Sequence, residues 1–301
     1  MDANKHITKF LNFLQYEKRY SAHTSKSYKL DLTQFEEFIQ RQYEITDITT
    51  AKHLHVRSWI VALMEAEMTT KSINRKISTL RSFFNFLKKK KEIETSPMQK
   101  IIAPKVGKRL PKYLSEENMK ALHEEIDMEQ TFSSTRNRLI IDLFYNTGIR
   151  RSELIQLTEA NTDTRNHSIK VLGKGNKERQ IPIPKALSEQ IERYRALKNE
   201  EFPTTEVNTL LLTDKGKTLY PRFVYNIVKR YIAKVSTIDQ KSPHVLRHTF
   251  ATHLINNGAE LNAIKELLGH SNLSATQIYT HNSITRLKDI YKKAHPSSKG
   301  Q

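Results

Sequence analysis

The first hundred residues place apolar side chains at intervals of three and four positions, the spacing that gathers side chains on one face of an α-helix. Four such stripes follow one another in this part of the chain. They are Ile7, Phe10, Leu11 and Leu14; Tyr28, Leu32, Phe35 and Phe38; Val56, Ile60, Leu63 and Met64; and Ile73, Ile77, Leu80, Phe84 and Leu87. Helices with one apolar face must bury it against one another, so residues 1–100 are predicted to form a small helical bundle.

Residues that can cap a helix precede several of these stripes. Serine and threonine side chains accept hydrogen bonds from the backbone N–H groups of a first helical turn. We therefore expect helices to begin near the following candidates: Thr24 or Ser25, Thr50, and Thr69 or Thr70.

Residues 96–112, SPMQKIIAPKVGKRLPK, differ from the sequence on either side of them because they combine proline, glycine and several lysines and arginines. Proline interrupts helices, and exposed Lys and Arg side chains stay hydrated. We therefore expect a basic linker over residues 101–112. A chain of 301 residues is long enough for a separate, cored domain on each side of it.

The remainder, residues 113–301, is predicted to form a second and mostly helical domain. Ser115 followed by two glutamates starts one helix, and others are expected over 134–146, 185–198, 221–235, 243–257 and 260–268. Two β-rich runs over 168–183 flank Gly-Lys-Gly-Asn, which predicts a hairpin. The predicted fold class is mainly α, in two domains, with a small β-hairpin or sheet in the second.

A last helix is expected over residues 284–294. Its apolar stripe consists of Ile284, Leu287, Ile290 and Tyr291. A helix this short is not stable alone in water, so we expect the stripe to be buried against its own domain or against a neighbouring subunit.

Charge narrows the class of partner. Fifty Lys and Arg against 32 Asp and Glu give a net charge of +18, and both halves of the chain share the excess. Such a surface favours nucleic acid, and less often an anionic membrane. The absence of cysteine excludes disulfides and thiol catalysis, and no run of 18 apolar residues predicts a membrane span. The first residues lack the apolar stretch of a signal peptide, so we expect a cytoplasmic protein.

His244, Arg247 and His248 lie on one predicted helix at spacings of three and four. Two histidines four residues apart can bind a metal, but the motif lacks the acid of HExxH and the chain has no cysteine to complete such a site. A histidine beside an arginine is better suited to bind an anion. The guanidinium of the arginine supplies a fork of hydrogen-bond donors, and the imidazole can transfer a proton. A surface helix with accidental charges is the alternative.

Three further segments carry candidate residues. Gly148 permits a sharp break from which Arg150 projects, with Ser152 a candidate cap for the next helix. Gly269 is a candidate helix end immediately before His270, and Tyr279 follows. A tyrosine nucleophile needs nearby cations, because a phenol with its usual pKa near 10 attacks weakly.

The second domain resembles the catalytic domain of tyrosine recombinases, the phage integrase family. That family's motif series is matched, in order and spacing, by TGIRRSEL, GKGNKERQIPIP, HVLRHTFATHLINNG, LLGHSNLSATQIYTH and RLKDIYKKAHP. The first domain resembles the family's SAM-like DNA clamp in SAHTSKSYKLDLTQFEEF and TTKSINRKISTLRSFFNFL. The resemblance covers nearly the whole chain, and the compact length and closing KAHP look most like the Xer subgroup.

The resemblance implies a catalytic set on matching positions, with an arginine standing beside Arg150 where a small apolar residue is more usual in the family. The implied set is Arg150, Lys174, His244, Arg247, His270 and the nucleophile Tyr279. Tyr279 would attack a DNA phosphodiester and form a 3′-phosphotyrosine, while the cationic groups neutralise charge on the phosphate. No metal and no cofactor are expected, and the chain has no GxxxxGK[ST] motif for a nucleotide.

The implied partner is a double-stranded DNA recombination site, bound by a homo- or hetero-tetramer on paired sites. The resemblance also implies an activating DNA translocase as a partner and a location at the nucleoid. It implies no contact with a membrane. Four residues near the fourth stripe are expected to contact DNA: Ser72, Arg75, Lys76 and Arg81. A merely solvated helix face is the alternative for them.

The Xer resemblance favours site-specific recombination that resolves chromosome or plasmid dimers. Three other functions remain open at this point: a mobile-element integrase, a type IB topoisomerase-like enzyme that acts on one strand, and a DNA-binding architectural protein without catalysis. The complete implied catalytic set argues against the last of these.

Overall fold

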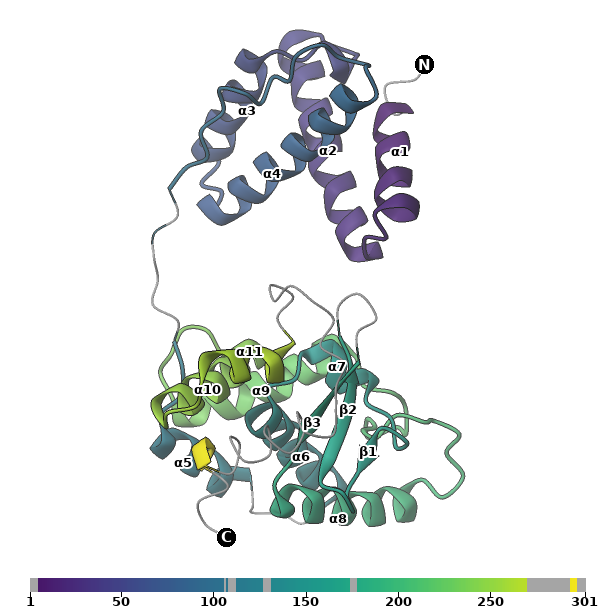
Figure 1. Ribbon diagram of the computed structural model, residues 1–301, viewed down its shortest axis with the longest axis vertical. Coiled ribbons are helices and arrows are strands. Elements are labelled where there is room, and N and C mark those ends of the chain that lie inside the picture. The colour runs from purple at the N-terminus through teal and green to yellow at the C-terminus, as the bar shows by residue number, and fades with distance from the viewer. Residues whose placement is uncertain are drawn as a thin grey trace. The chain divides into compact units, whose positions relative to one another are not determined.

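The computed structural model describes residues 5–105, 107, 112–126, 131–173, 178–269 and 293–296. The chain divides into two units, Met1–Arg109 and Leu110–Gln301, which are treated separately below (Figure 1). The organisation is mainly helical, as predicted, with a small antiparallel sheet in the second unit.

The first unit is a helical bundle. Helix α1 (Lys5–Asn12) continues into the π-helical turn η1 (Phe13–Glu17), and α2 (Ala22–Tyr43), the short η2 (Ile48–Thr50), α3 (His53–Glu65) and α4 (Thr70–Lys89) follow. Thr69 caps α4 as predicted, because its side chain accepts from the Ser72 N–H. The expected start of α2 was wrong: Ser21 is the cap, and its hydroxyl accepts from the Thr24 N–H. Thr50 lies in η2, and α3 begins after Lys52.

An aromatic core holds this bundle together. The rings of Phe10, Phe35, Phe83 and Phe84 are fully buried among aliphatic side chains from α1, α2, α3 and α4. Ile101, which lies in the predicted linker, is also buried in this core. The chain after α4 is therefore packed on the first unit as far as Ile101.

The second unit contains helices α5 (Glu116–Ile126), α6 (Phe132–Thr147) and α7 (Arg151–Gln156), then strands β1 (Thr162–Asp163), β2 (Ser168–Leu172) and β3 (Glu178–Pro182), and finally α8 (Lys185–Glu201), α9 (Pro221–Val235), α10 (Pro243–Asn256) and α11 (Leu261–Leu268). The strands form an antiparallel sheet in the order β1-β2-β3, with Ile169 opposite Ile181. The predicted β2–β3 hairpin is present, whereas the two-residue β1 was not predicted.

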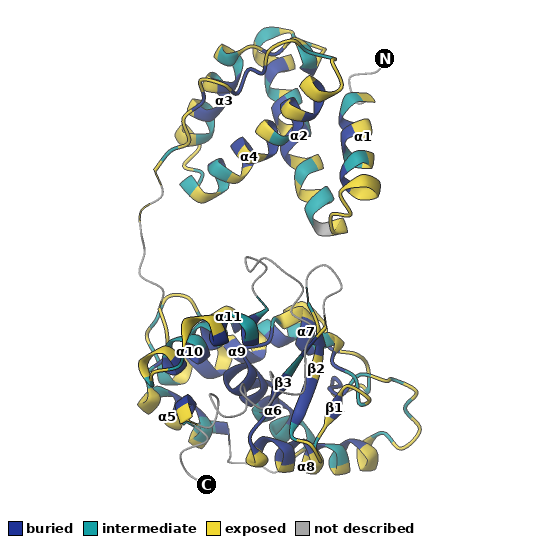
Figure 2. Cartoon of the chain, viewed as in Figure 1, coloured by how far each residue is buried: buried dark blue, intermediate teal, exposed yellow. Residues whose placement is uncertain are grey.

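Helix α6 is the centre of the second unit. It packs against α5, α8, α9 and α10, and every residue from Leu139 to Thr147 is buried (Figure 2). Because neighbours surround it, α6 lacks the single apolar stripe of a surface helix. Its carboxyl end leads directly to Gly148 and Arg150, so the most buried helix of this unit positions a candidate catalytic residue.

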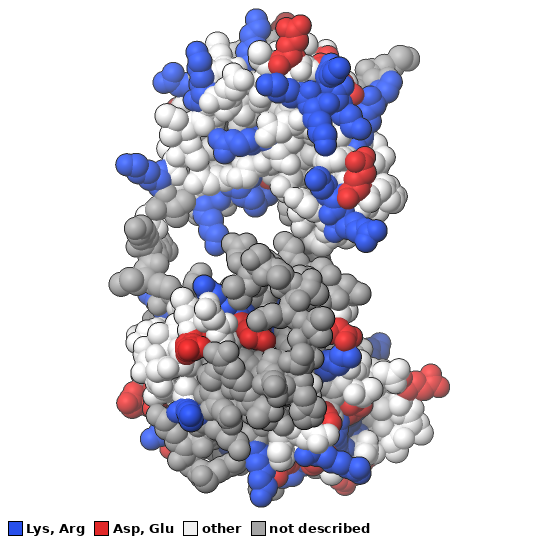
Figure 3. Space-filling model, viewed as in Figure 1, with Lys and Arg blue, Asp and Glu red and all other residues white. Residues whose placement is uncertain are grey.

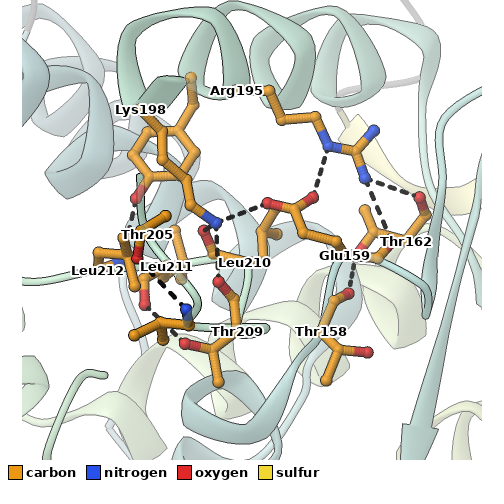
Figure 4. A network of polar contacts seen from close by, with 12 residues as sticks. Thr158, Glu159, Thr162, Arg195, Lys198, Thr205, Thr209, Leu210, Leu211 and Leu212 are labelled. Carbon is orange, nitrogen blue, oxygen red and sulfur yellow. Dashed lines mark hydrogen bonds and ion pairs between the residues drawn. The ribbon is translucent and has the colours of Figure 1, made fainter. Parts of the chain in front are cut away.

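A polar network joins α8 to the loops beside it. Arg195 donates from Nε to Glu159 Oε2 at 2.8 Å, and the buried Lys198 donates from Nζ to Glu159 Oε1 at 2.8 Å (Figure 4). Lys198 also donates to the carbonyls of Thr209 and Leu210, at 2.9 and 3.2 Å. Both cations bind acceptors of their own unit, which indicates a structural role, and Lys198 fastens Thr209 and Leu210 to α8.

Within the described ranges, no helix is long and apolar enough to cross a membrane.

Candidate active site

Arg150 lies where α6 gives way to α7. Gly148 ends α6 in the left-handed conformation, with φ of 58°, and an added Cβ there would lie 2.5 Å from a ring carbon of Phe250. Only glycine suits both the conformation and the close approach. Arg150, not the predicted Ser152, is the residue that precedes α7, and its backbone N–H donates to Glu153 Oε2 at 2.7 Å.

Glu153 is a buried carboxylate shared by two arginines. Arg150 donates from Nη1 to its Oε1 at 2.7 Å, and Arg179 from β3 approaches both oxygens, with Nη1···Oε1 at 2.9 Å and Nη2···Oε2 at 2.8 Å. Burial by itself would raise the pKa of Glu153, but the hydrogen bonds and charge of Arg179, together with the hydrogen bonds from Arg150, lower it to about 2. Glu153 is therefore ionised at neutral pH.

Arg247 projects from α10 into the same region. Its Nη1 donates to the Gly148 carbonyl, and its Nη2 donates to the Leu268 carbonyl at 2.7 Å. Burial, followed by repulsion from Arg150 and Arg179, lowers the pKa of Arg247 to about 10, so it remains charged at neutral pH.

The end of α11 is the point where the three arginines meet. Arg179 Nε donates to the Leu267 carbonyl at 2.9 Å, Arg247 donates to Leu268, and Arg150 Nη2 donates to the Gly269 carbonyl at 2.9 Å. The carboxyl end of a helix carries partial negative charge, so cations there are stabilised. Gly269 ends α11 in the left-handed conformation, as predicted, and the arginines thus fix the backbone up to the residue before His270.

The cluster has an excess of positive charge. Three guanidinium groups lie in the cluster with one carboxylate, which Arg150 and Arg179 bind. Each guanidinium has five N–H donors, so each can bind a carbonyl and a further acceptor together. Arg150 keeps 30% of its side chain exposed. The arrangement is suited to bind an anion whose oxygens accept several hydrogen bonds, such as a phosphodiester.

His244 lies in the first turn of α10, exposed, one turn before Arg247. His248 is half-buried one turn further along, and burial lowers its pKa. In the described part of the chain, no group of three or more His, Asp or Glu side chains is arranged to hold a metal ion.

Several predicted residues lie outside the described ranges: Lys174, His270, Tyr279 and the apolar stripe of the expected tail helix. Near that tail, Ala294 and His295 are described, and both are buried in the core of the second unit. The structure thus brings Arg150 and Arg247 together, with His244 on the helix that carries Arg247.

Two residues of the cluster, Glu153 and Arg179, were not predicted as functional. For Glu153, which is buried, the sequence offers no direct signal, because an Arg–Glu pair three residues apart usually lies on a helix surface. A signal for Arg179 exists in the hairpin, because it lies two positions before Ile181 and so shares the inward face of β3. An arginine on the buried face of a strand requires a buried anion, and Glu153 supplies it.

The predicted DNA-contacting residues of α4 differ in their exposure. Lys76 does not share an exposed face with the others: it is buried, and its Nζ donates to Asp31 Oδ1 at 3.0 Å and to Gln34. Arg75 and Arg81 are exposed, and Arg75 also pairs with Asp31. Ser72 is half-buried, and its backbone N–H and hydroxyl are bonded to Thr69.

In the view of Figure 3, the charged patches on the first unit are mostly Lys and Arg. Lys76 is buried and paired, so a DNA contact by α4 stays a prediction for Arg75, Arg81 and the half-buried Ser72. Arg81 is further held by a bond from Nη2 to the Ile101 carbonyl at 3.2 Å.

Comparison with known proteins agrees with this geometry. Residues 112–286 match the profile of the Phage integrase family, and residues 7–91 match that of the Phage integrase, N-terminal SAM-like domain. A tyrosine recombinase XerC of Staphylococcus haemolyticus is 38% identical, with 96% of each chain covered. A tyrosine recombinase XerC of Chlorobaculum parvum is 33% identical over 96% of this chain and 94% of its own.

Solved structures share the fold. XerH site-specific recombinase bound to difH substrate in a pre-cleavage complex has a TM-score of 0.68 at 23% identity, covering 94% of this chain and 83% of its own. The Tn1549 transposon integrase with circular intermediate DNA has a TM-score of 0.69 at 20% identity, covering 98% and 97%. With two family profiles matched along the chain and relatives above 30% identity over nearly all of it, the chain belongs to the phage integrase family as an Xer-type tyrosine recombinase, an enzyme that cleaves and rejoins DNA strands.

Proposed function

We propose that the chain cleaves a DNA recombination site with Tyr279, and that Arg150 and Arg247 hold the phosphate under attack. The observation that carries this proposal is the arginine cluster at the end of α11, with Arg150 and Arg247 bonded to the carbonyls of Gly269 and Leu268. Two guanidinium groups that are already in position before substrate binds need little reorganisation when negative charge develops on a phosphate.

Each residue has a distinct role in the proposed reaction. Tyr279 attacks phosphorus in line, so that a phosphotyrosine bond forms and the bond to the 5′-oxygen breaks. His244 accepts the tyrosyl proton and Lys174 protonates the departing 5′-oxygen, while His270 donates a hydrogen bond to the phosphate. The phosphotyrosine bond conserves the energy of the broken ester, so attack by another strand's 5′-hydroxyl rejoins DNA without a nucleotide.

Two members of this set are supported by their positions. His244 lies one turn before Arg247 on α10, so both face the same side of that helix. His270 follows Gly269, whose carbonyl Arg150 holds, so the arginine that binds phosphate also fixes the backbone before the histidine. No metal and no cofactor are proposed, because the cationic side chains supply the charge.

The biological partner is proposed to be a paired recombination site occupied by a homo- or hetero-tetramer. Resolution of chromosome or plasmid dimers is favoured over mobile-element integration by the XerC names of the full-length relatives. A cytoplasmic, nucleoid-associated location and an activating DNA translocase complete the proposal. XerH was solved on its difH substrate, which supports a specific duplex as the ligand of this chain also.

Covalent trapping on a nicked recombination-site duplex tests the nucleophile. The nick lets the short cleaved strand diffuse away, so the enzyme stays attached to DNA. Wild-type protein should give a protein–DNA band that survives denaturant, with or without EDTA. Tyr279→Phe should bind the same duplex with unchanged affinity and give no such band. A denaturant-resistant band from Tyr279→Phe would remove Tyr279 from this role.

A sulfur-substituted substrate tests the proposed acid. When sulfur replaces the 5′-leaving oxygen, the thiolate departs without a proton. Lys174→Ala should then recover cleavage, whereas Arg247→Ala should not, because a guanidinium that stabilises charge is still required. Equal recovery of both variants would show that the division of roles is wrong.

A further inference from the structure

His295, near the end of the chain, is buried in the core of the second unit. Its imidazole has no exposed surface and lies between two aromatic rings, 5.0 Å from the ring centre of Tyr145 and 5.6 Å from that of Phe250. The preceding Ala294 is 2% exposed in the same core. His295 therefore docks against α6 and α10, the helices that lead to Arg150 and carry Arg247.

The ring also makes a directional bond with the end of α6. The last carbonyls of an α-helix have no partner within the helix and must find one elsewhere. At this end the Gly148 N–H donates to the Phe144 carbonyl at 3.0 Å, and the next carbonyl, that of Tyr145, lies 3.1 Å from His295 Nε2. A carbonyl only accepts, so Nε2 carries the proton and donates it.

The hydroxyl end of Tyr145 is held as well. Its Oη lies 3.0 Å from His253 Nδ1, and His253 Nε2 lies 2.9 Å from the Leu114 carbonyl. Nε2 must donate to that carbonyl, so in the neutral ring Nδ1 accepts from the tyrosine hydroxyl. His253 thus holds the side chain of Tyr145, and His295 holds its backbone.

The held residue lies a short way before the catalytic arginine. From Tyr145 the chain runs through Gly148, which has no room for a Cβ, to Arg150. The Gly148 carbonyl, in this same connection, accepts from Arg247. Movement at the end of α6 would therefore shift both arginines of the phosphate site.

We propose that His295 is a positioning residue, which caps the carboxyl end of α6 and thereby keeps Arg150 and the Gly148 carbonyl in register with Arg247. The proposal rests on the proposed function, because it assumes that these arginines bind the reacting phosphate. It goes beyond that function by assigning a role in cleavage to a side chain that does not touch DNA.

The docked ring has a spectroscopic signature. Burial lowers the pKa of His295 to about 3; the bond to the Tyr145 carbonyl opposes this shift, and the nearby His253 adds to it. Among the residues that the structure describes, Tyr145 on α6 and His253 on α10 are titratable groups beside the ring. A docked imidazole stays neutral between pH 8 and pH 5, whereas a solvent-exposed one titrates near 6.5.

Two variants separate the donor from the ring. His295→Phe keeps an aromatic ring but removes the N–H, and His295→Gln keeps an N–H donor at a similar reach. Cleavage is measured in a single turnover on nicked duplex at saturating protein, with duplex affinity measured separately. We expect His295→Phe to slow covalent-complex formation about 10-fold. His295→Gln should retain most of the wild-type rate, and both variants should keep the wild-type affinity.

Histidine NMR titration of the full chain provides the second measurement. The resonance that His295→Gln removes should stay constant from pH 8 to pH 5 in the wild type. A cleavage rate of His295→Phe equal to wild type, a matching loss of affinity and rate, or titration near pH 6.5 would each overturn the proposal. If the wild type itself formed no covalent complex, the proposed function would fail, while the NMR result would still decide whether the ring is docked.

Discussion

Each of the two units buries one carboxylate between a buried cation and a partly exposed one. The two sets are Glu153, Arg179 and Arg150 in the second unit and Asp31, Lys76 and Arg75 in the first. In both, the buried cation neutralises the carboxylate and the second cation remains as surplus charge near the surface. Arg150 is 30% exposed at this position and Arg75 is 46% exposed.

The two sets differ in what surrounds the surplus cation. Arg150 is also bonded to the end of α11 and lies beside Arg247. Asp31 instead accepts a further bond from the Thr79 hydroxyl, which has no charge to contribute to a phosphate. The same arrangement of a buried carboxylate and two cations thus forms part of a multidentate anion site in the second unit. In the first unit it orients a single exposed cation. We infer that the second unit binds one phosphate for reaction, and that the first contacts phosphates only for affinity.

Removal of the Glu153 charge should have the largest effect on stability. Glu153→Gln leaves Arg179 buried without an anion, which is expected to lower the free energy of unfolding by about 4 kcal/mol. Circular dichroism during urea unfolding should show the loss. The fluorescence of Trp59, which is the only tryptophan and is buried in the first unit, should report an unchanged transition for that unit.

The corresponding substitution in the first unit should shift the unfolding transition that Trp59 fluorescence reports. Asp31→Asn leaves Lys76 buried without its partner and should destabilise this unit by about 3 kcal/mol, measured by Trp59 fluorescence. The Lys76 ammonium lies 5.6 Å from the Trp59 ring centre, so the reporter is close to the change. Adding Lys76→Met should restore most of the stability. If the double variant is as unstable as the single one, the pair is not what holds α2 to α4.

Acid should weaken the second unit through Glu153. Its pKa is lowered to about 2 in the folded state from an ordinary value near 4.5. The unfolded chain therefore binds a proton more readily, so the contribution of this group is complete above about pH 4.5 and is lost as pH falls toward 2. The loss amounts to about 3 kcal/mol. Unfolding free energies at pH 5 and pH 3 should differ less in Glu153→Gln than in the wild type.

The smallest effect on stability is expected for the surplus cation of the first unit. Arg75→Ala removes a partly exposed partner of Asp31, and such pairs contribute only up to about 1 kcal/mol. DNA affinity should nevertheless fall, and the slope of log affinity against log salt should decrease by about 1, because one phosphate contact is lost. Arg81→Ala offers a comparison with a second exposed arginine of α4 that Asp31 does not hold.

Much of the fold could be predicted because its signals are local. Helix α9 spans the predicted residues 221–235, and its start has a proline in the first turn, where a missing N–H has no cost. The β2–β3 hairpin follows from two β-rich runs around a glycine-rich turn. The start of α3 was misplaced because Thr50 has the composition of a cap but belongs to η2, where its hydroxyl donates to the Asp47 carbonyl.

The buried ion pairs could not be predicted in the same way. Lys76 was expected on an exposed face because lysine is usually hydrated, and its partner Asp31 lies on another helix, far away in the sequence. Arg179 on β3 and Glu153 on α7 likewise meet only in the tertiary structure. Arg150 and Arg247, by contrast, could be proposed from the family resemblance, because they occupy matching positions in the family's motifs.

The difference between the two surplus cations can be measured directly with substitutions that retain charge. A lysine cannot reproduce the fork of a guanidinium, so Arg150→Lys should slow covalent-complex formation at saturating DNA by about 100-fold, with little change in affinity. Arg75→Lys should leave that rate within about twofold of wild type, because an exposed phosphate contact needs charge more than geometry. A rate for Arg75→Lys as low as that of Arg150→Lys, or a wild-type rate for Arg150→Lys, would contradict the assignment of reaction to one unit and affinity to the other.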